Sequence, residues 1–468
     1  MIANNVEPWK PLYAGCDTVA SVDQAATHSR GEAKLAFAFL WLFTFVGFGR
    51  PEDLFPAVGA LHLTFLCSIC ALGAYVVPLV GGRVRLLLPR ELILVLLLTT
   101  WFILGIPFAF YRTGSLMALI QIWVRTLLFF FLLIQTLTSV SRIRKILWAV
   151  LLSELMATSA SILMQGKEAS EAGERLAGVN QGLLGWNFLG ITVAVTLPYV
   201  AFLYISRRSA LRTSLLLVVL VLAMWMLVLT ASRGGFLGII FSMATTWWFV
   251  MRNSSRGRAA GFLLLMFFGV ALMKAPDIFW LRMQTIWADS ESTVNIASES
   301  AEESARGRQF LLERSIEYTL QNPVFGLGLG GFPVYNGNQL RRPDAWMGTH
   351  NTFTQLSSEG GIPALLLFLT LFGTVLRRMK RASDELKNDP LNSELRLLAR
   401  ATFASALAFA FGGFFAHLAY EFLFYYVVGI SAAIWLIAQQ SAEVSRSRIG
   451  SLDAVTVPPS QRCPEWRR

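Results

Sequence analysis

Apolar runs long enough to cross a lipid bilayer recur along this chain from Leu35 to Ala438. Only 15% of its residues are charged, well below the roughly 25% of soluble proteins. A water-soluble fold is therefore excluded, and the sequence predicts an all-α integral membrane protein with twelve transmembrane helices. The predicted spans are residues 33–49, 57–79, 91–111, 117–138, 144–164, 183–205, 213–230, 234–251, 259–273, 353–376, 397–417 and 420–440.

Lysine and arginine residues are unevenly shared between the loops that join these spans. With the N-terminus in the cytoplasm, each cytoplasmic loop carries a basic cluster, such as Arg83, Arg85 and Arg90 before the third span. Because cytoplasmic loops of membrane proteins are enriched in these residues, both termini are predicted to lie in the cytoplasm. The net charge of +11 is then a signal of orientation, and nucleic acid is not an expected partner.

The predicted spans divide the chain into five parts. A cytoplasmic tail (1–34) precedes nine helices (35–273), a large outer loop (274–352), three further helices (353–440) and a second cytoplasmic tail (441–468). The first tail lacks a compact basic region, and no convincing cleavage site follows the first apolar run. That run is therefore predicted to be retained as a helix.

The large outer loop is predicted to be partly helical and packed against the membrane. Two groups of apolar residues recur in it at helical spacing, which favours amphipathic helices at the membrane surface. They are Phe279, Trp280, Met283 and Trp287, and then Leu312, Ile316 and Leu320.

Four motifs of glycine and polar residues lie beside this loop or at its end. They are, in chain order, Ser232-Arg233-Gly234-Gly235 after an apolar helix, the glycine-rich run 326–332, Thr349-His350-Asn351, and Glu359-Gly360-Gly361-Ile362-Pro363 opening into an apolar helix. With Arg308 placed before Pro323 and with the twelve-helix frame, this order resembles the O-antigen ligase and O-antigen polymerase superfamily of bacterial inner-membrane glycosyltransferases. The resemblance covers about residues 183–378, and the first five helices match the family only in hydropathy.

The resemblance implies a reaction on the periplasmic face of the inner membrane. A glycan would pass from undecaprenyl diphosphate to an acceptor, without a metal or another cofactor, and the key positions would be Arg233, Arg308 and His350. Ligases of the family use lipid A core as the acceptor, polymerases use a second carrier-linked glycan, and some relatives modify protein. Since all of them share these motifs, the sequence leaves ligase and polymerase open.

Arginine and histidine suit the chemistry of such a reaction. Guanidinium groups bind phosphate through two parallel hydrogen bonds, so Arg233 and Arg308 are expected to hold the diphosphate, with Arg306 in reserve. His350 is the only histidine in an outer loop, and His417 lies where the eleventh helix meets the outer surface. A histidine with a pKa near 6.5 is suited to accept a proton from an acceptor hydroxyl, so His350 is the predicted general base.

Four further residues are expected to support the site. Asn351 would orient neighbouring groups and Glu359 would fix a backbone group or an arginine, with capping of a helix end as the alternative for both. Gly328 and Gly330 would allow tight turns next to the head group of the carrier. Because no buried strand precedes this run and no Lys-Ser or Lys-Thr follows it, a nucleotide-binding loop is not favoured.

Two alternatives remain. Glu52 and Asp53 in the first outer loop would fit the divalent-metal site of another class of lipid-carrier glycosyltransferases, although capping of the local turn is the favoured interpretation. The second alternative is a transporter of a lipid or solute, which would depend on charged residues within the helices. Two of these, Arg125 and Glu154, are first expected to form a structural ion pair. The gathering of the motifs on one face favours the enzyme.

Overall fold

The computed structural model describes most of the chain between Ala33 and Ala454. The described ranges are 33–49, 51, 61–171, 186–206, 209–284, 286, 296–341 and 347–454. Within these ranges every regular element is a helix, which confirms the all-α prediction.

The helices follow the order of the apolar runs, with three short elements of 3₁₀ or π geometry between them. In chain order they are α2 (Lys34–Gly49), α5 (Leu63–Val80), α6 (Arg90–Gly105), η1 (Ile106–Phe108), α7 (Arg112–Ala118), η2 (Leu119–Trp123), α8 (Val124–Thr136), α9 (Val140–Glu171), α10 (Trp186–Ser206), α11 (Ala210–Thr230), α12 (Arg233–Thr246), η3 (Trp247–Met251), α13 (Ser255–Met273), α14 (Asp277–Gln284), α15 (Ile296–Gln321), α16 (Gly331–Leu340), α17 (Thr352–Glu385), α18 (Ser393–Gly412) and α19 (Phe422–Ala454).

Eleven of the helical segments in the described residues are long and apolar enough to cross a membrane. They correspond to eleven of the twelve predicted spans. The remaining prediction, 33–49, corresponds to the apolar helix α2, which has 16 residues. At 1.5 Å per residue it is about 24 Å long, which is short of the roughly 30 Å hydrocarbon core.

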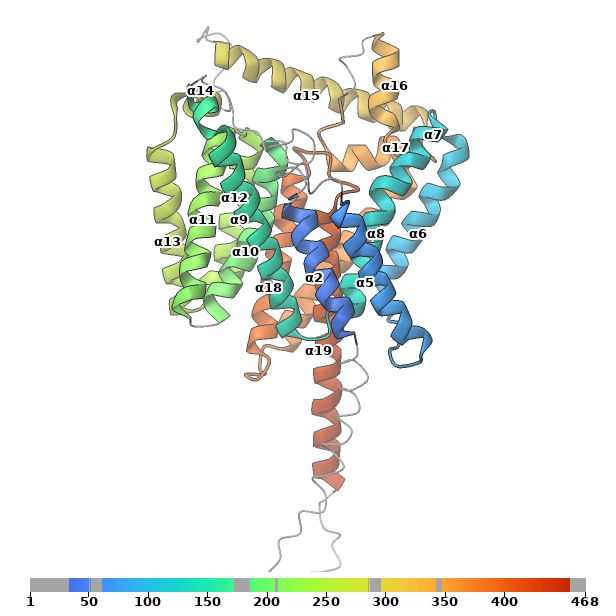
Figure 1. Cartoon of the computed structure of the whole chain (residues 1–468), viewed down its shortest axis with the longest axis vertical. Helices are drawn as coiled ribbons and strands as arrows, with labels where there is room; N and C mark the ends of the chain where they lie inside the picture. Colours follow the sequence, from blue (N-terminus) through green and yellow to red (C-terminus); the bar gives the residue numbers. More distant parts are fainter. Residues whose placement is uncertain are drawn as a thin grey trace, which may run out of the picture.

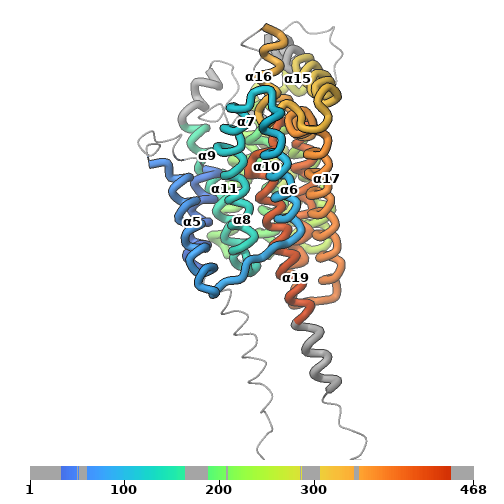
Figure 2. Tube along the Cα trace, turned by 90° about the vertical axis from the view of Figure 1, so that its right-hand side faces the viewer, coloured from blue at the N-terminus to red at the C-terminus, as the bar shows by residue number. Residues whose placement is uncertain are grey.

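The outer loop forms a helical cap on one end of the bundle. In Figure 1, α14, α15 and α16 lie at the end opposite to the one from which α19 projects, and α15 lies across the bundle. Figure 2 shows the same separation from the side. The prediction of a partly helical loop is therefore confirmed.

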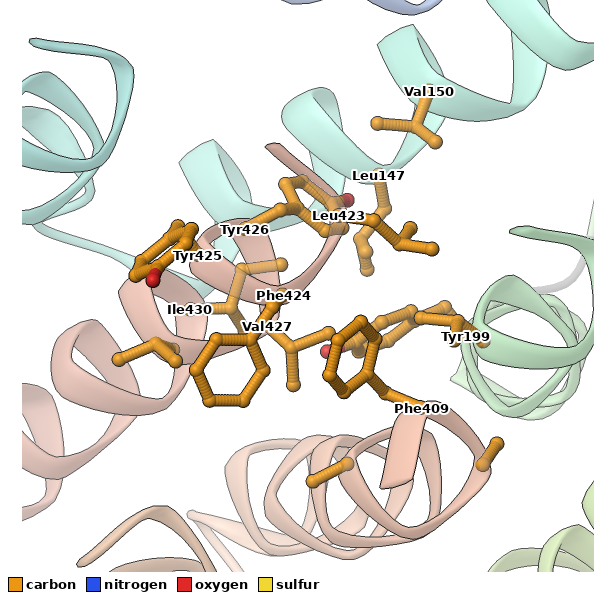
Figure 3. Close-up of a cluster of buried hydrophobic side chains, with 14 of the residues drawn as sticks. Leu147, Val150, Tyr199, Phe409, Leu423, Phe424, Tyr425, Tyr426, Val427 and Ile430 are labelled. Carbon is orange, nitrogen blue, oxygen red and sulfur yellow. The ribbon is translucent and has the colours of Figure 1, made fainter. Parts of the chain in front are cut away.

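Buried aromatic residues form the core of the bundle around α19. Figure 3 shows Tyr425 and Tyr426 in one buried cluster with Tyr199 of α10 and Phe409 of α18, and these four side chains are at most 1% exposed. Tyr426 meets Tyr199 nearly edge-on, with ring centroids 6.2 Å apart. Edge-on contacts of this kind stabilise a core beyond the area that they bury, and here they fix α10 and α19 relative to each other.

Glycines allow α10 and α12 to approach closely. A Cβ atom on Gly190 would lie 2.7 Å from the Cα atom of Gly235, so neither position accepts a larger residue without movement. Small residues commonly bring membrane helices together in this way. The contact fixes the first turn of α12, where Arg233 lies.

The helix α17 is bent at Gly361, where the backbone adopts φ 77° and ψ 176°. A Cβ atom at this glycine would lie 2.0 Å from the carbonyl oxygen of Val324. The amide N–H of Ile362 donates to the carbonyl of Pro323 over 2.8 Å, and the indole of Trp101 donates to the carbonyl of Gly360 over 2.9 Å. The chain after α15 and the indole of Trp101 on α6 therefore satisfy backbone groups that the bend releases.

The predicted ion pair between Arg125 and Glu154 is wrong. Arg125 is exposed and donates its Nε–H to the carbonyl of Gln121 on the preceding turn. Glu154 accepts a hydrogen bond from the hydroxyl of Thr196 over 3.2 Å. Helical periodicity identifies charged residues within spans, but the rotation of each helix in the bundle decides which of them meet.

Candidate functional site

The turn between α11 and α12 presents Arg233. Ala231 adopts a left-handed backbone (φ 43°) after the last residue of α11, and Ser232 is the N-cap of α12. The Ser232 hydroxyl accepts a hydrogen bond from the amide of Gly235 over 3.1 Å, which is the usual role of serine at this position. Arg233 is thus the first residue of a capped helix.

Arg308 lies on the face of α15 that packs on the rest of the protein. Leu311, Ser315 and Tyr318 are buried and follow it at helical spacing. Arg308 itself is half-buried, whereas Arg306 is exposed. The pKa of Arg308 is lowered to about 10, first by burial and then by the positive charges of Arg233 and Arg282.

His350 precedes α17 in a turn that is fixed by many hydrogen bonds. Its backbone is left-handed, with φ 51°. Asn351 is the N-cap of α17, and its side-chain oxygen accepts from the amides of Phe353 (2.9 Å) and Thr354 (3.1 Å). The amide of Thr352 donates to the carbonyl of Gly413 over 2.7 Å. The capping alternative for Asn351 is therefore what the structure has, and the cap holds His350 in place.

His417 lies next to His350, which the sequence analysis did not foresee. The two rings are 5.2 Å apart between centroids and inclined by 71°. A Cβ atom on Gly348 would lie 2.9 Å from the ring of His417, so this glycine allows the turn to approach the second imidazole. The pKa of His350 is lowered to about 4, first by burial and then by His417 and Arg308. His350 is consequently neutral near pH 7.

One cavity brings the three predicted key residues together. Arg233, Arg308 and His350, from segments far apart in the sequence, line an open space of about 400 Å³. Phe414 and Phe415 contribute apolar walls. The cavity therefore combines positive charge, a neutral imidazole and apolar surface, which suits a ligand that is anionic at one end and lipid-like at the other.

A third arginine lies beside this cavity. Arg282 on α14 is 5% exposed, and its Nε–H donates to the carbonyl of Ala231 over 3.3 Å. Its pKa is lowered by burial and by the charge of Arg233. Sequence analysis missed it, although Phe279 and Met283 mark the buried face of α14 and Arg282 lies on that same face.

The glycine-rich run is part of the scaffold in this structure. Gly328 has φ 89°, and its amide donates to the carbonyl of Glu359 over 2.9 Å. A Cβ atom on Gly328 would lie 2.4 Å from both the Cβ atom of Ala109 and the hydroxyl of Ser115. Gly330 is the left-handed N-cap of α16. Within the described part of the chain, neither glycine is among the residues that line the cavity.

Glu359 stabilises the end of the glycine-rich run. Its side chain is 2% exposed, and one carboxylate oxygen accepts from the amide of Phe332 over 3.3 Å. Glu359 thus fixes a backbone group, which is one of its two predicted roles.

The proposed metal site at Glu52 and Asp53 lies outside the described residues. Within the residues that the structure describes, no group of three or more His, Cys, Asp or Glu side chains is arranged to hold a metal ion.

Comparison with known proteins gives one family. Residues 218–369 match the family model described as O-antigen ligase. Arg233, Arg308 and His350 all fall within the match, which begins in α11 and ends in α17. No curated protein matches the chain.

Proposed function

We propose that this protein transfers an oligosaccharide or polysaccharide from undecaprenyl diphosphate to an acceptor, without a metal, on the periplasmic face of the inner membrane. The match of residues 218–369 to the O-antigen ligase family model supports the proposal. The observation that carries the proposal is the cavity in which Arg233, Arg308 and His350 meet. Family membership supports a role in polysaccharide biosynthesis, and the cavity supports the donor and the mechanism.

Arg233 and Arg308 bind the diphosphate of the donor. A lipid diphosphate carries two to three negative charges, and guanidinium groups bind such oxygens through paired hydrogen bonds. The lowered pKa of Arg308 supports this assignment, because positive groups crowded into a half-buried site are stabilised by an anion. The apolar walls at Phe414 and Phe415 suit the adjoining isoprene units.

His350 removes the proton from the acceptor hydroxyl. Its lowered pKa keeps it neutral at physiological pH, so its nitrogen is available to accept that proton. The hydroxyl oxygen bonds to the anomeric carbon as the bond from that carbon to the diphosphate oxygen breaks. The diphosphate leaves as an anion on the arginines, and the proton on His350 passes to solvent. Direct attack of this kind inverts the anomeric centre.

The orientation of the bundle follows from its charges. The helical cap lies at one end, and α19 projects from the other (Figure 1). The positive-inside pattern of the sequence supports a cytoplasmic position for the end from which α19 projects. The cavity then faces the periplasm.

Transfer from a purified polyprenyl-diphosphate oligosaccharide tests the proposal. The assay contains a chelator and offers lipid A core and a carrier-linked glycan in parallel, because the choice between ligase and polymerase rests on the acceptor consumed. We expect His350→Ala to lower the rate about 100- to 10,000-fold, since a general base contributes that much. Arg233→Ala should also abolish most activity, and Arg314→Gln serves as the control, because Arg314 pairs with Glu317 on the exposed side of α15.

Three results would contradict the proposal. They are transfer that stops in chelator, a product with retained configuration, and transfer that is unchanged in both cavity variants. Loss of transport in Glu154→Gln with His350→Ala unaffected would support the transporter instead.

A further inference from the structure

We propose that Arg282 is a third arginine of the anion site and acts as a positioning residue, which fixes Arg233 and makes the cavity prefer a diphosphate to a monophosphate. The inference rests on the proposed function, because it concerns the same anion. It adds a residue that lies in none of the motifs of the sequence.

The helix α14 is docked against the start of α12. Phe279 is fully buried and meets Phe236 nearly edge-on, with ring centroids 5.7 Å apart and planes inclined by 81°. Met283 is 2% exposed on the same side of α14. Arg282 is buried on this same face, one turn after Phe279 and next to Met283 in the chain. Its side chain is therefore held at the turn that precedes α12.

Arg282 hydrogen-bonds to Ala231, the residue whose left-handed backbone forms the turn between α11 and α12. Ala231 is fully buried and left-handed, a conformation that is costly for a residue with a side chain. Arg282 donates to the carbonyl of this residue, two positions before Arg233. Removing the donor would leave a buried carbonyl without this partner and would loosen the backbone that directs Arg233.

Arg282 also adds charge to the site. Besides burial, which is the largest cause of both shifts, the charges of Arg233 and Arg282 lower the pKa of Arg308, and the charge of Arg233 lowers the pKa of Arg282. The three guanidinium groups therefore interact electrostatically. Such a cluster gains most from the ligand with the most negative charge. A diphosphate therefore benefits from the third arginine more than a monophosphate does.

Lipid binding to the full-length protein in detergent tests the inference. The probes are undecaprenyl diphosphate and undecaprenyl monophosphate, measured by native mass spectrometry. We expect Arg282→Gln to weaken binding of the diphosphate about 10- to 100-fold and of the monophosphate much less. Arg282→Lys should recover part of the loss, because it keeps the charge. Arg314→Gln is again the control.

A double-variant comparison tests positioning. If Arg282 acts through Arg233, the variant with both residues changed to Gln should lose less affinity than the product of the two single losses. Fully multiplicative losses would overturn the positioning role. A folded Arg282→Lys variant that binds both lipids equally weakly would show a structural role alone and would also overturn the inference.

Failure of the inference and failure of the proposed function give different results. If Arg282→Gln binds the diphosphate as the wild type does while Arg233→Gln does not, Arg282 is not part of the site and the proposed function stands. The proposed function is refuted if the wild type binds neither lipid. It is also refuted if the wild type binds both lipids with equal affinity and Arg233→Gln does not change that affinity.

Discussion

The rate of glycan transfer should stay level from pH 8 down to about pH 5, because His350 remains neutral over this range. With a pKa of about 4, roughly 0.1% of His350 carries a proton at pH 7. At the ordinary value of 6.5, about a quarter would be protonated at that pH. The acidic limb of kcat/KM reports the base in the free enzyme and should therefore lie near pH 4.

The acidic limb of the pH profile of kcat should lie at a higher pH than the acidic limb of kcat/KM. In the donor complex, the diphosphate compensates the charge of Arg308, which is one cause of the lowered pKa of His350. Arg308→Gln removes the same charge from the free enzyme, so its kcat/KM limb should move above 4. It should remain below 6.5, because burial is the larger cause.

Steady-state transfer rates from about pH 3 to about pH 9 measure these limbs, with Arg314→Gln as the control. Since the chain has four histidines, NMR of isotope-labelled histidine gives an independent titration of His350. A wild-type kcat/KM limb near pH 6.5 would refute the reasoning. So would a limb that does not move in either Arg308→Gln or His417→Gln.

Two further predictions concern stability in detergent. Gly328→Ala should destabilise the protein by about 1–3 kcal/mol, since φ is 89° and the new Cβ atom meets two neighbours at 2.4 Å. The matched change Gly307→Ala, where nothing lies within 4 Å, should be neutral or stabilising by up to about 1 kcal/mol, and equal thermal unfolding temperatures for the two variants would contradict this account. Arg378→Met should cost about 3–5 kcal/mol, because it leaves the buried Glu91 carboxylate without its ion-pair partner. Denaturant unfolding checks this, and the double change with Glu91→Gln should recover most of the loss.

The membrane helices could be predicted from sequence because their cause is local. An apolar run of sufficient length is favoured in hydrocarbon wherever it packs, so eleven predicted spans appear among the described helices. The favoured choice of Arg308 over Arg306 agrees with the helical phase of α15, because Leu311, Ser315 and Tyr318 define its buried face.

Features that depend on docking between segments could not be predicted in the same way. His417 meets His350 only because the turn at Gly348 packs on the segment after α18. Arg282 reaches Ala231 only because α14 folds back onto α12. The wrong pairing of Arg125 with Glu154 has the same origin, since sequence spacing carries no information on how neighbouring helices are rotated.

The bend at Gly361 has a consequence for protein engineering. The chain from Pro323 to Gly328 hydrogen-bonds with the residues on both sides of the bend, through Ile362, Ser358 and Glu359. An outer loop grafted from a relative would have to reproduce these contacts. Without them, the bend in α17 would not be maintained. The loop therefore cannot be exchanged on its own. Chimaeras intended to change acceptor preference should exchange it together with α17 as one piece.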